Sequence, residues 1–174
     1  MRPKRLISLL VAVCMMITML PLSAVTAFAA DTSPSTKHTT AINGYKYDYE
    51  VDANGNATIT GFHGPEGYSL YDLDIPETLG KYTVTAIGNG AFYDQYCLSN
   101  VTIPQSVKSI GYEAFCKCTA MESLTIKNAA TSIGDSAFRE CPWLTTVNLG
   151  EHITTIGEAA FLDCERLDNV TIPD

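Results

Sequence analysis

A 23-residue repeat fills the second half of the chain and constrains the fold more than any other feature. Ile-Gly pairs recur at a step of 23 from Ile87-Gly88 to Ile156-Gly157. Ala-Phe pairs keep the same step and place phenylalanines at 92, 115, 138 and 161. A repeat of this length cannot enclose a core alone, so neighbouring repeats must stack and share one. The sequence therefore predicts a solenoid whose four phenylalanines form one column.

Each repeat divides into an extended part and a turn. Val101-Thr102-Ile103 alternates inward and outward, as a short strand does, and the pattern returns at 124–126, 147–149 and 170–172. Gly111 and its equivalents are expected to take a positive φ where the chain bends. Tyr112-Glu113-Ala114-Phe115 reads as one turn of α-helix or 3₁₀-helix. We therefore expect 23-residue coils with a ladder of short parallel β-strands and short helical or 3₁₀ turns.

The solenoid is predicted over residues 70–174, as four coils and a final strand. The coils begin at Leu70, Leu98, Met121 and Leu144, and about five extra residues fall in the first one, around 79–82. Upstream, strand-like segments at 45–51 and 57–59 flank Asn54-Gly55, a favoured two-residue hairpin turn. Residues 42–69 are therefore interpreted as an N-terminal β-hairpin cap over the first coil.

The first 29 residues are typical of a secretory signal peptide. Arg2, Lys4 and Arg5 precede an apolar run, and Ala27-Phe28-Ala29 offers small residues for cleavage. Residues 30–41, rich in Ser and Thr, are interpreted as a flexible linker. Cleavage would remove 3 of 11 basic and none of 19 acidic residues, which leaves 8 basic against 19 acidic and a net charge of −11. We expect a secreted or cell-surface protein that binds no nucleic acid and does not insert into the membrane after cleavage.

Three segments resemble the leucine-rich repeats of the BspA-like family. They are SIGYEAFCKCTAMESLTI, SIGDSAFRECPWLTTVNL and TIGEAAFLDCERLDNVTI. The resemblance covers about residues 45–174 and implies a right-handed leucine-rich-repeat solenoid on a bacterial secreted or surface protein. It also implies adhesion and protein binding, without naming a ligand, because a shared scaffold does not fix a shared site.

The candidate binding residues are the outward strand positions and one tryptophan. Solenoids commonly bind across their strand face. Trp143 shares its repeat column with Ala120 and Arg166, a variability that indicates an outward side chain. Exposed Thr and Asn can also simply keep a strand soluble, and Trp143 can simply cover its neighbour, so both interpretations stay open. The candidates are Asn100, Thr102, Ser123, Thr125, Thr146, Asn148, Asn169, Thr171 and Trp143.

The sequence offers little for catalysis or metal binding. His38, His63 and His152 stand apart from any active-site motif, and Cys116-Lys117-Cys118 lacks the spacing of a zinc knuckle. We therefore expect no enzyme activity, no cofactor and no metal. The other cysteines downstream of the signal are Cys97, Cys141 and Cys164, and those at 118, 141 and 164 are interpreted as inward thiols. If a bridge forms, the sequence favours Cys97 with Cys116 or Cys118.

The leading hypothesis is a non-enzymatic protein-binding or adhesion module whose partner is an extracellular or surface protein. The alternative is the accessory recognition portion of a larger extracellular enzyme truncated at residue 174. A flat ice- or glycan-binding face on Thr102, Thr125 and Thr171 is a third hypothesis, interrupted by Asn148. The chain stops just after a repeat strand, so self-association through an uncapped C-terminal end is also expected.

Overall fold

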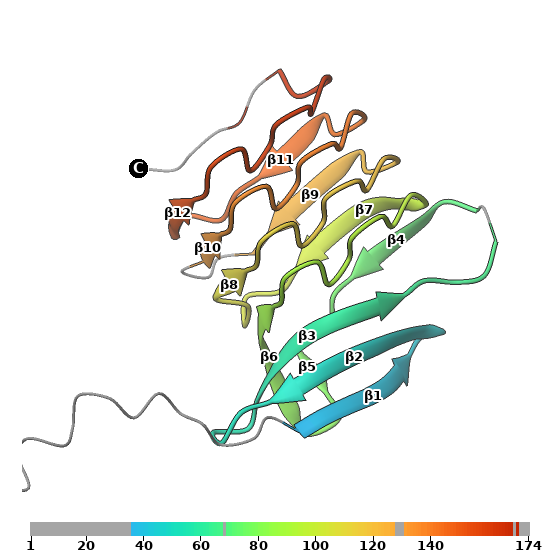
Figure 1. The fold of residues 1–174 in the computed structure, drawn as a ribbon, viewed down its shortest axis with the longest axis vertical. Helices are drawn as coiled ribbons and strands as arrows, with labels where there is room; N and C mark the ends of the chain where they lie inside the picture. The colour runs from blue at the N-terminus through green and yellow to red at the C-terminus, as the bar shows by residue number, and fades with distance from the viewer. Residues whose placement is uncertain (1–35, 68, 128–130, 169, 171–174) are drawn as a thin grey trace, which may run out of the picture. The chain divides into compact units, whose positions relative to one another are not determined.

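A computed structural model describes residues 36–67, 69–127, 131–168 and 170 (Figure 1). All of these lie in one compact unit, residues 34–174. The predicted signal peptide, the first part of the predicted linker and most of the predicted final strand at 170–172 fall outside the described residues. Among the described residues, no helix is long and apolar enough to cross a membrane.

Two sheets run through the coils. One contains, in spatial order, β1 (Thr36–Ile42), β2 (Tyr45–Val51), β3 (Asn56–His63), β6 (Tyr82–Ile87), β8 (Ser109–Ile110), β10 (Thr131–Ile133) and β12 (Ile153–Ile156), with β5 (Thr78–Leu79) beside β6. The other contains β4 (Tyr71–Asp74), β7 (Leu98–Ile103), β9 (Ser123–Ile126) and β11 (Thr146–Asn148). From β3 onward, the strands of successive coils pair in parallel in both sheets. The ladder predicted from Val101-Thr102-Ile103 is the second sheet, and the first sheet was not predicted.

The phenylalanines form one column through the core, as predicted. The rings of Phe92, Phe115, Phe138 and Phe161 stack nearly parallel, with successive centroids 4.7, 5.2 and 5.3 Å apart. The first three are fully buried. Phe62 of β3 extends the column, with its centroid 4.9 Å from that of Phe92. The hairpin and the repeats therefore share one continuous core.

The turns between the sheets are not helical, and the prediction of α- or 3₁₀-helical turns was wrong for the residues described. Each turn carries two left-handed residues four positions apart, such as Glu113 (φ 50°) and Lys117 (φ 62°). These conformations aim alternate amides at the next coil: Phe92 N donates to Ala114 O at 2.8 Å, and Phe115 N to Ala137 O at 2.7 Å. A helix would direct every interior amide along its own axis. The turns thus form a third hydrogen-bonded ladder between coils, here called the turn ladder.

The recurrent glycines permit close approach of the coils, and the expected positive φ is absent from them. Gly88, Gly111, Gly134 and Gly157 all lack left-handed φ values. A β-carbon on Gly134 would instead lie 2.8 Å from the carbonyl carbon of Gly111 and 2.9 Å from the oxygen of Ile110. Backbone atoms of the preceding coil occupy the space that a side chain would need, which explains why only glycine recurs here.

The first coil departs from the repeat in two places. Its register shifts between Tyr71 and Leu73, so Tyr71 pairs with Leu98. Leu70, which the sequence places in the core as the start of this coil, is consequently 60% exposed. The extra residues form a tight antiparallel connection between β5 and β6, with Gly80 at a φ of 64°.

The hairpin of β2 and β3 forms as expected, but the predicted linker does not extend to residue 41. Residues 36–42 form β1, which pairs antiparallel with β2 along its whole length. Asn43 and Gly44 both have positive φ, as a two-residue hairpin turn requires. The Asn-Gly signal used at 54–55 was therefore present at 43–44 as well. His38, stacked on Tyr49 with 5.2 Å between centroids, adds packing that polar composition alone does not reveal.

Candidate functional site

The second sheet brings six of the predicted binding residues onto one outward face. Residues of β7, β9 and β11 lie in two rows that run across the strands. One row contains Asn100, Ser123 and Thr146, and the other contains Thr102, Thr125 and Asn148. Asn169 and Thr171 lie outside the described residues.

The first row is hydrogen-bonded within itself. Ser123 Oγ donates to Asn100 Oδ1 at 2.5 Å, and Asn100 Nδ2 donates to Asp72 Oδ1 at 2.6 Å. Asp72, from β4, completes this chain of three side chains across three coils. Because these groups already satisfy one another, they gain less from an external hydrogen-bonding ligand, which favours the structural interpretation of this row.

The second row borders a shallow cavity of about 450 Å³. Thr125 and Asn148 line it, together with the exposed Gln105 and Lys127 at the ends of their strands. Ile126 and Leu149 also line the cavity, but both are buried, so this open face offers hydrogen bonds without a large exposed apolar anchor. The three predicted residues of this row therefore remain candidates for polar contacts only.

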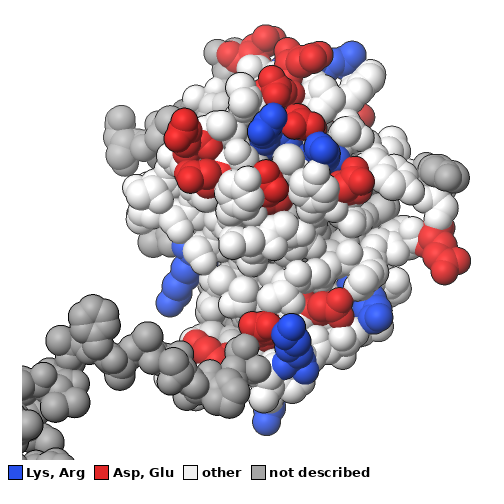
Figure 2. Space-filling view, viewed as in Figure 1, with Lys and Arg blue, Asp and Glu red and all other residues white. Residues whose placement is uncertain are grey.

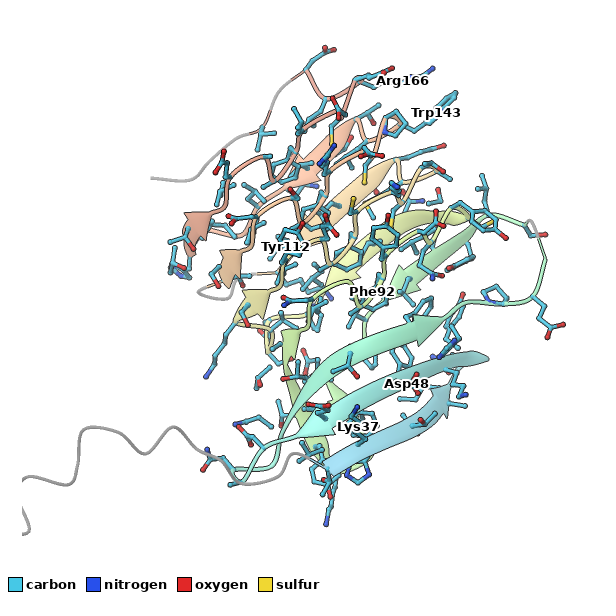
Figure 3. The ribbon with its side chains drawn as sticks, in the orientation of Figure 1. Lys37, Asp48, Phe92, Tyr112, Trp143 and Arg166 are labelled. Carbon is cyan, nitrogen blue, oxygen red and sulfur yellow. The ribbon has the colours of Figure 1, made fainter. Side chains whose placement is uncertain are left out.

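Trp143 lies at the loop edge of the coils, beside the second sheet. Its side chain is 49% exposed. Arg166, one repeat later, places its guanidinium carbon 3.5 Å from the centre of the indole ring, and Figure 3 shows both side chains projecting outward together. A cavity of about 360 Å³ lies beside the indole, lined by Leu70, Thr119, Ala120, Glu122 and Trp143. The tryptophan therefore borders an open pocket together with residues of the preceding coil, and this cavity is here called the Trp143 pocket.

The surface around the coils is mainly acidic. The whole sequence has a formal net charge of −8. Figure 2 shows acidic side chains gathered over the upper coils, with a few Lys and Arg among them. Asp135, Glu158, Asp163, Glu165 and Asp168 are exposed in the last two coils described. Such a surface attracts cations and repels polyanions.

All five cysteines in the described residues are free thiols. The bridge favoured by the sequence, between Cys97 and Cys116 or Cys118, is therefore not formed in this structure. Cys118 and Cys141 are fully buried, as predicted for inward thiols, and Cys164 is half-buried. Each donates to the carbonyl of a phenylalanine in the preceding coil, at 3.2 to 3.4 Å. Burial raises the pKa of the Cys118 thiol, which makes it a poor nucleophile.

The histidines do not assemble a catalytic centre among the described residues. His63 bonds Asp48 at 2.9 Å on the exposed face of the hairpin, and Thr39 donates to the same carboxylate at 2.6 Å. Both hydrogen bonds hold the pKa of Asp48 below its usual range, and the bond from Thr39 has the larger effect. The Asp52 carboxylate accepts the amides of Asn54 and Asn56, which organises the hairpin turn. The part of the chain that the structure describes contains no cluster of three His, Cys, Asp or Glu suited to a metal ion.

Comparison with known families decides the relationship. Residues 68–174 match the BspA type leucine rich repeat region, in 6 copies. The chain belongs to the BspA-type leucine-rich-repeat family. Comparison with curated proteins gave no match.

Solved structures of bacterial leucine-rich-repeat proteins share this fold. A leucine rich cell surface protein from Faecalibacterium prausnitzii is 34% identical with a TM-score of 0.66, over 80% of this chain and 38% of that one. A leucine-rich repeat protein from Bacteroides capillosus is 25% identical with a TM-score of 0.61, over 78% of this chain and 99% of that one. Another, from Bacteroides ovatus, is 25% identical with a TM-score of 0.59, over 77% and 41% respectively. The chain thus spans well under half the length of two of these relatives.

Proposed function

We propose that this BspA-type protein is an exported, non-enzymatic recognition module that binds extracellular or surface proteins. The half-exposed Trp143 beside an open pocket is the observation that carries the proposal. Tryptophan is enriched among the residues that dominate protein interfaces. The signal-peptide pattern at 1–29 supports export, and the similarity to a cell surface protein supports a surface location.

The Trp143 pocket is a better binding candidate than the strand face. The outward row of Asn100 and Ser123 is hydrogen-bonded internally, and the row of Thr102, Thr125 and Asn148 offers no aromatic side chain. Trp143 combines a large apolar area with low conformational freedom, because Arg166 already covers one face of its ring. In this proposal the strand-face threonines and asparagines supply peripheral contacts.

The antiparallel strands at the N-terminal side have a structural role in this proposal. Strand β3 pairs with β6, and Phe62 covers the end of the phenylalanine column at Phe92. We assign β1, β2 and β3 the role of a cap that shields the first coil from water, as terminal segments of repeat proteins generally do.

A capture experiment tests the proposed function. The mature chain is immobilised and exposed to soluble extracellular-matrix and cell-surface proteins, and bound proteins are identified. We expect specific partners that Trp143→Ala loses. Tyr112→Ala is the matched control, because Tyr112 is 50% exposed, nearly the same as Trp143, but follows β8 on another part of the surface (Figure 3). Equal capture by both variants, or no enriched partner, would contradict the proposal.

A second candidate is the accessory portion of a larger extracellular enzyme. The observation that favours it is that the chain spans only 38% and 41% of two of its relatives. The coding sequence beyond residue 174 tests it: an open reading frame that continues into a catalytic domain would support this candidate, and an immediate stop codon would exclude it.

A further inference from the structure

Arg166 covers one face of Trp143, and an open pocket lies beside the indole on the side of the preceding coil. Stacked parallel strands are about 4.8 Å apart, so residues at equivalent repeat positions lie above one another. The following coil supplies Arg166, whose guanidinium lies on one face of the indole at 3.5 Å. The preceding coil supplies only the methyl group of Ala120. The Trp143 pocket lies on that side, since Thr119, Ala120 and Glu122 line it and Arg166 does not.

The open side carries negative charge. Glu122 lines the pocket, is exposed, and within the described residues has no ion-pair or hydrogen-bond partner for its carboxylate. The electron-rich face of the indole also attracts cations. Leu70 and Ala120 add apolar walls that fit an aliphatic stem. A long side chain with a positive end is therefore complementary to the pocket in both shape and charge.

The contact made by Arg166 shows which cation fits best. A guanidinium is flat, stacks on aromatic rings, and binds a carboxylate through two parallel hydrogen bonds. A lysine ammonium is a compact, strongly hydrated charge that does not stack in this way. Ala120 leaves room where a longer side chain at this repeat position would lie. A second guanidinium placed there would stack on the indole from that side, as the guanidinium of Arg166 does from the opposite side.

We propose that the Trp143 pocket binds an arginine side chain of a partner protein. The guanidinium stacks on the free face of Trp143 and pairs with Glu122, and its stem lies against Leu70 and Ala120. This inference rests on the proposed function and names the chemistry of the partner: a segment of a basic protein that presents an exposed arginine. The net charge of −11 that remains after cleavage of the predicted signal peptide would speed the approach of such a partner.

Fluorescence of Trp143 reports on the pocket directly, because it is the only tryptophan in the chain. The probe is a short peptide without tryptophan that contains one arginine, and its matched control carries neutral citrulline of nearly the same shape. We expect the arginine peptide to change the emission saturably, with a dissociation constant near millimolar, and the citrulline peptide to bind at least threefold more weakly.

Two variants locate the interaction. Glu122→Gln keeps the pocket shape and should weaken the arginine peptide about two- to fivefold while leaving the citrulline peptide unchanged. Ala120→Arg should supply an internal guanidinium and abolish the fluorescence response, with an unchanged circular dichroism spectrum to show that the coils still form. Ala120→Ser is its control and should bind like the parent.

Specific outcomes would overturn the inference. Equal binding of the arginine and citrulline peptides would remove the role of charge, and an equal or stronger response to methyl glycosides would make the pocket a sugar site. Captured partners without any arginine preference would overturn this inference alone. An arginine preference without any captured protein would instead count against the proposed function.

Discussion

Gly134→Ala tests whether the recurrent glycines exist to let the coils approach. The added β-carbon would lie 2.8 Å from the carbonyl carbon of Gly111 and 2.9 Å from the oxygens of Gly111 and Ile110. Ordinary contacts of this kind are about 3.5 Å, so the two coils must separate by about 0.6 Å here. The obstructing atoms belong to the backbone and cannot move aside by changing rotamer.

The expected cost follows from what the separation disturbs. The Gly134 amide donates to Ile110 O at 2.8 Å, and stretching this bond removes about 1 kcal/mol. Crowding a packed core adds about 1 to 3 kcal/mol of strain. Replacing glycine by alanine restricts the unfolded chain, which returns about 0.5 to 1 kcal/mol. We therefore expect Gly134→Ala to lower the free energy of unfolding by about 1 to 3.5 kcal/mol.

Urea unfolding followed by circular dichroism measures this loss. Gly61→Ala is the matched control, because the atoms nearest to a β-carbon at Gly61 belong to the side chain of Asp48, at 3.3 Å and beyond, and not to backbone. We expect the control to remain within about 0.5 kcal/mol of the parent. If Gly134→Ala proves as stable as Gly61→Ala, the close approach of the coils does not explain why glycine recurs.

Three further predictions concern the core, the hairpin and the thiols. Phe115→Ala should lower the free energy of unfolding by about 3 to 5 kcal/mol, and Phe161→Ala should lower it clearly less, because Phe161 is only half-buried. Equal losses for the two variants in urea titrations would argue against a shared column. The lowered pKa of Asp48 means that its carboxylate stabilises the fold above about pH 4, and that this contribution disappears as the pH falls through the lowered value. Asp48→Asn should therefore cost up to about 1 kcal/mol at pH 7 and progressively less below pH 4, a trend that unfolding midpoints across pH would show or refute. In the folded protein, a thiol reagent should modify the half-buried Cys164 well before Cys118, whose pKa burial raises; peptide mapping showing Cys118 labelled first would contradict the packing.

Periodicity alone was sufficient to predict the coils and their register. A step of 23 places Val101 opposite Leu124 and Val147, and the strands pair in that register. The same step predicts the phenylalanine column, because identical apolar residues at one repeat position must share the core. These features depend on residue type and spacing, both of which can be read directly from the sequence.

Other features depend on backbone geometry and could not be predicted from the sequence pattern. The pattern of Tyr112 to Phe115 suits a helical turn equally well, and nothing in it shows that alternate amides will bond to the next coil. The glycine after Ile110 was interpreted through its own conformation, whereas its neighbour in the preceding coil decides its identity. Phe62 lies outside the repeat, so periodicity could not assign it to the column.

The candidate pocket was only partly foreseeable. The variable column of Ala120, Trp143 and Arg166 indicated an exposed tryptophan, but not that Arg166 covers one of its faces while a pocket lies beside it. Leu70 was expected in the core, and only the shifted register of β4 moves it to the pocket. The contribution of Glu122 depends on its position beside the indole, which repeat spacing alone does not specify.

The orientation of the ladders determines how this protein would respond to mechanical load. In both sheets and in the turn ladder, the hydrogen bonds join one coil to the next, so a pull along the stack peels them apart one coil at a time. Each coil of 23 residues that detaches can release about 76 to 83 Å of extended chain. A molecule tethered between a cell and a surface would therefore lengthen in steps and absorb work under tension, while the coils that have not detached stay folded.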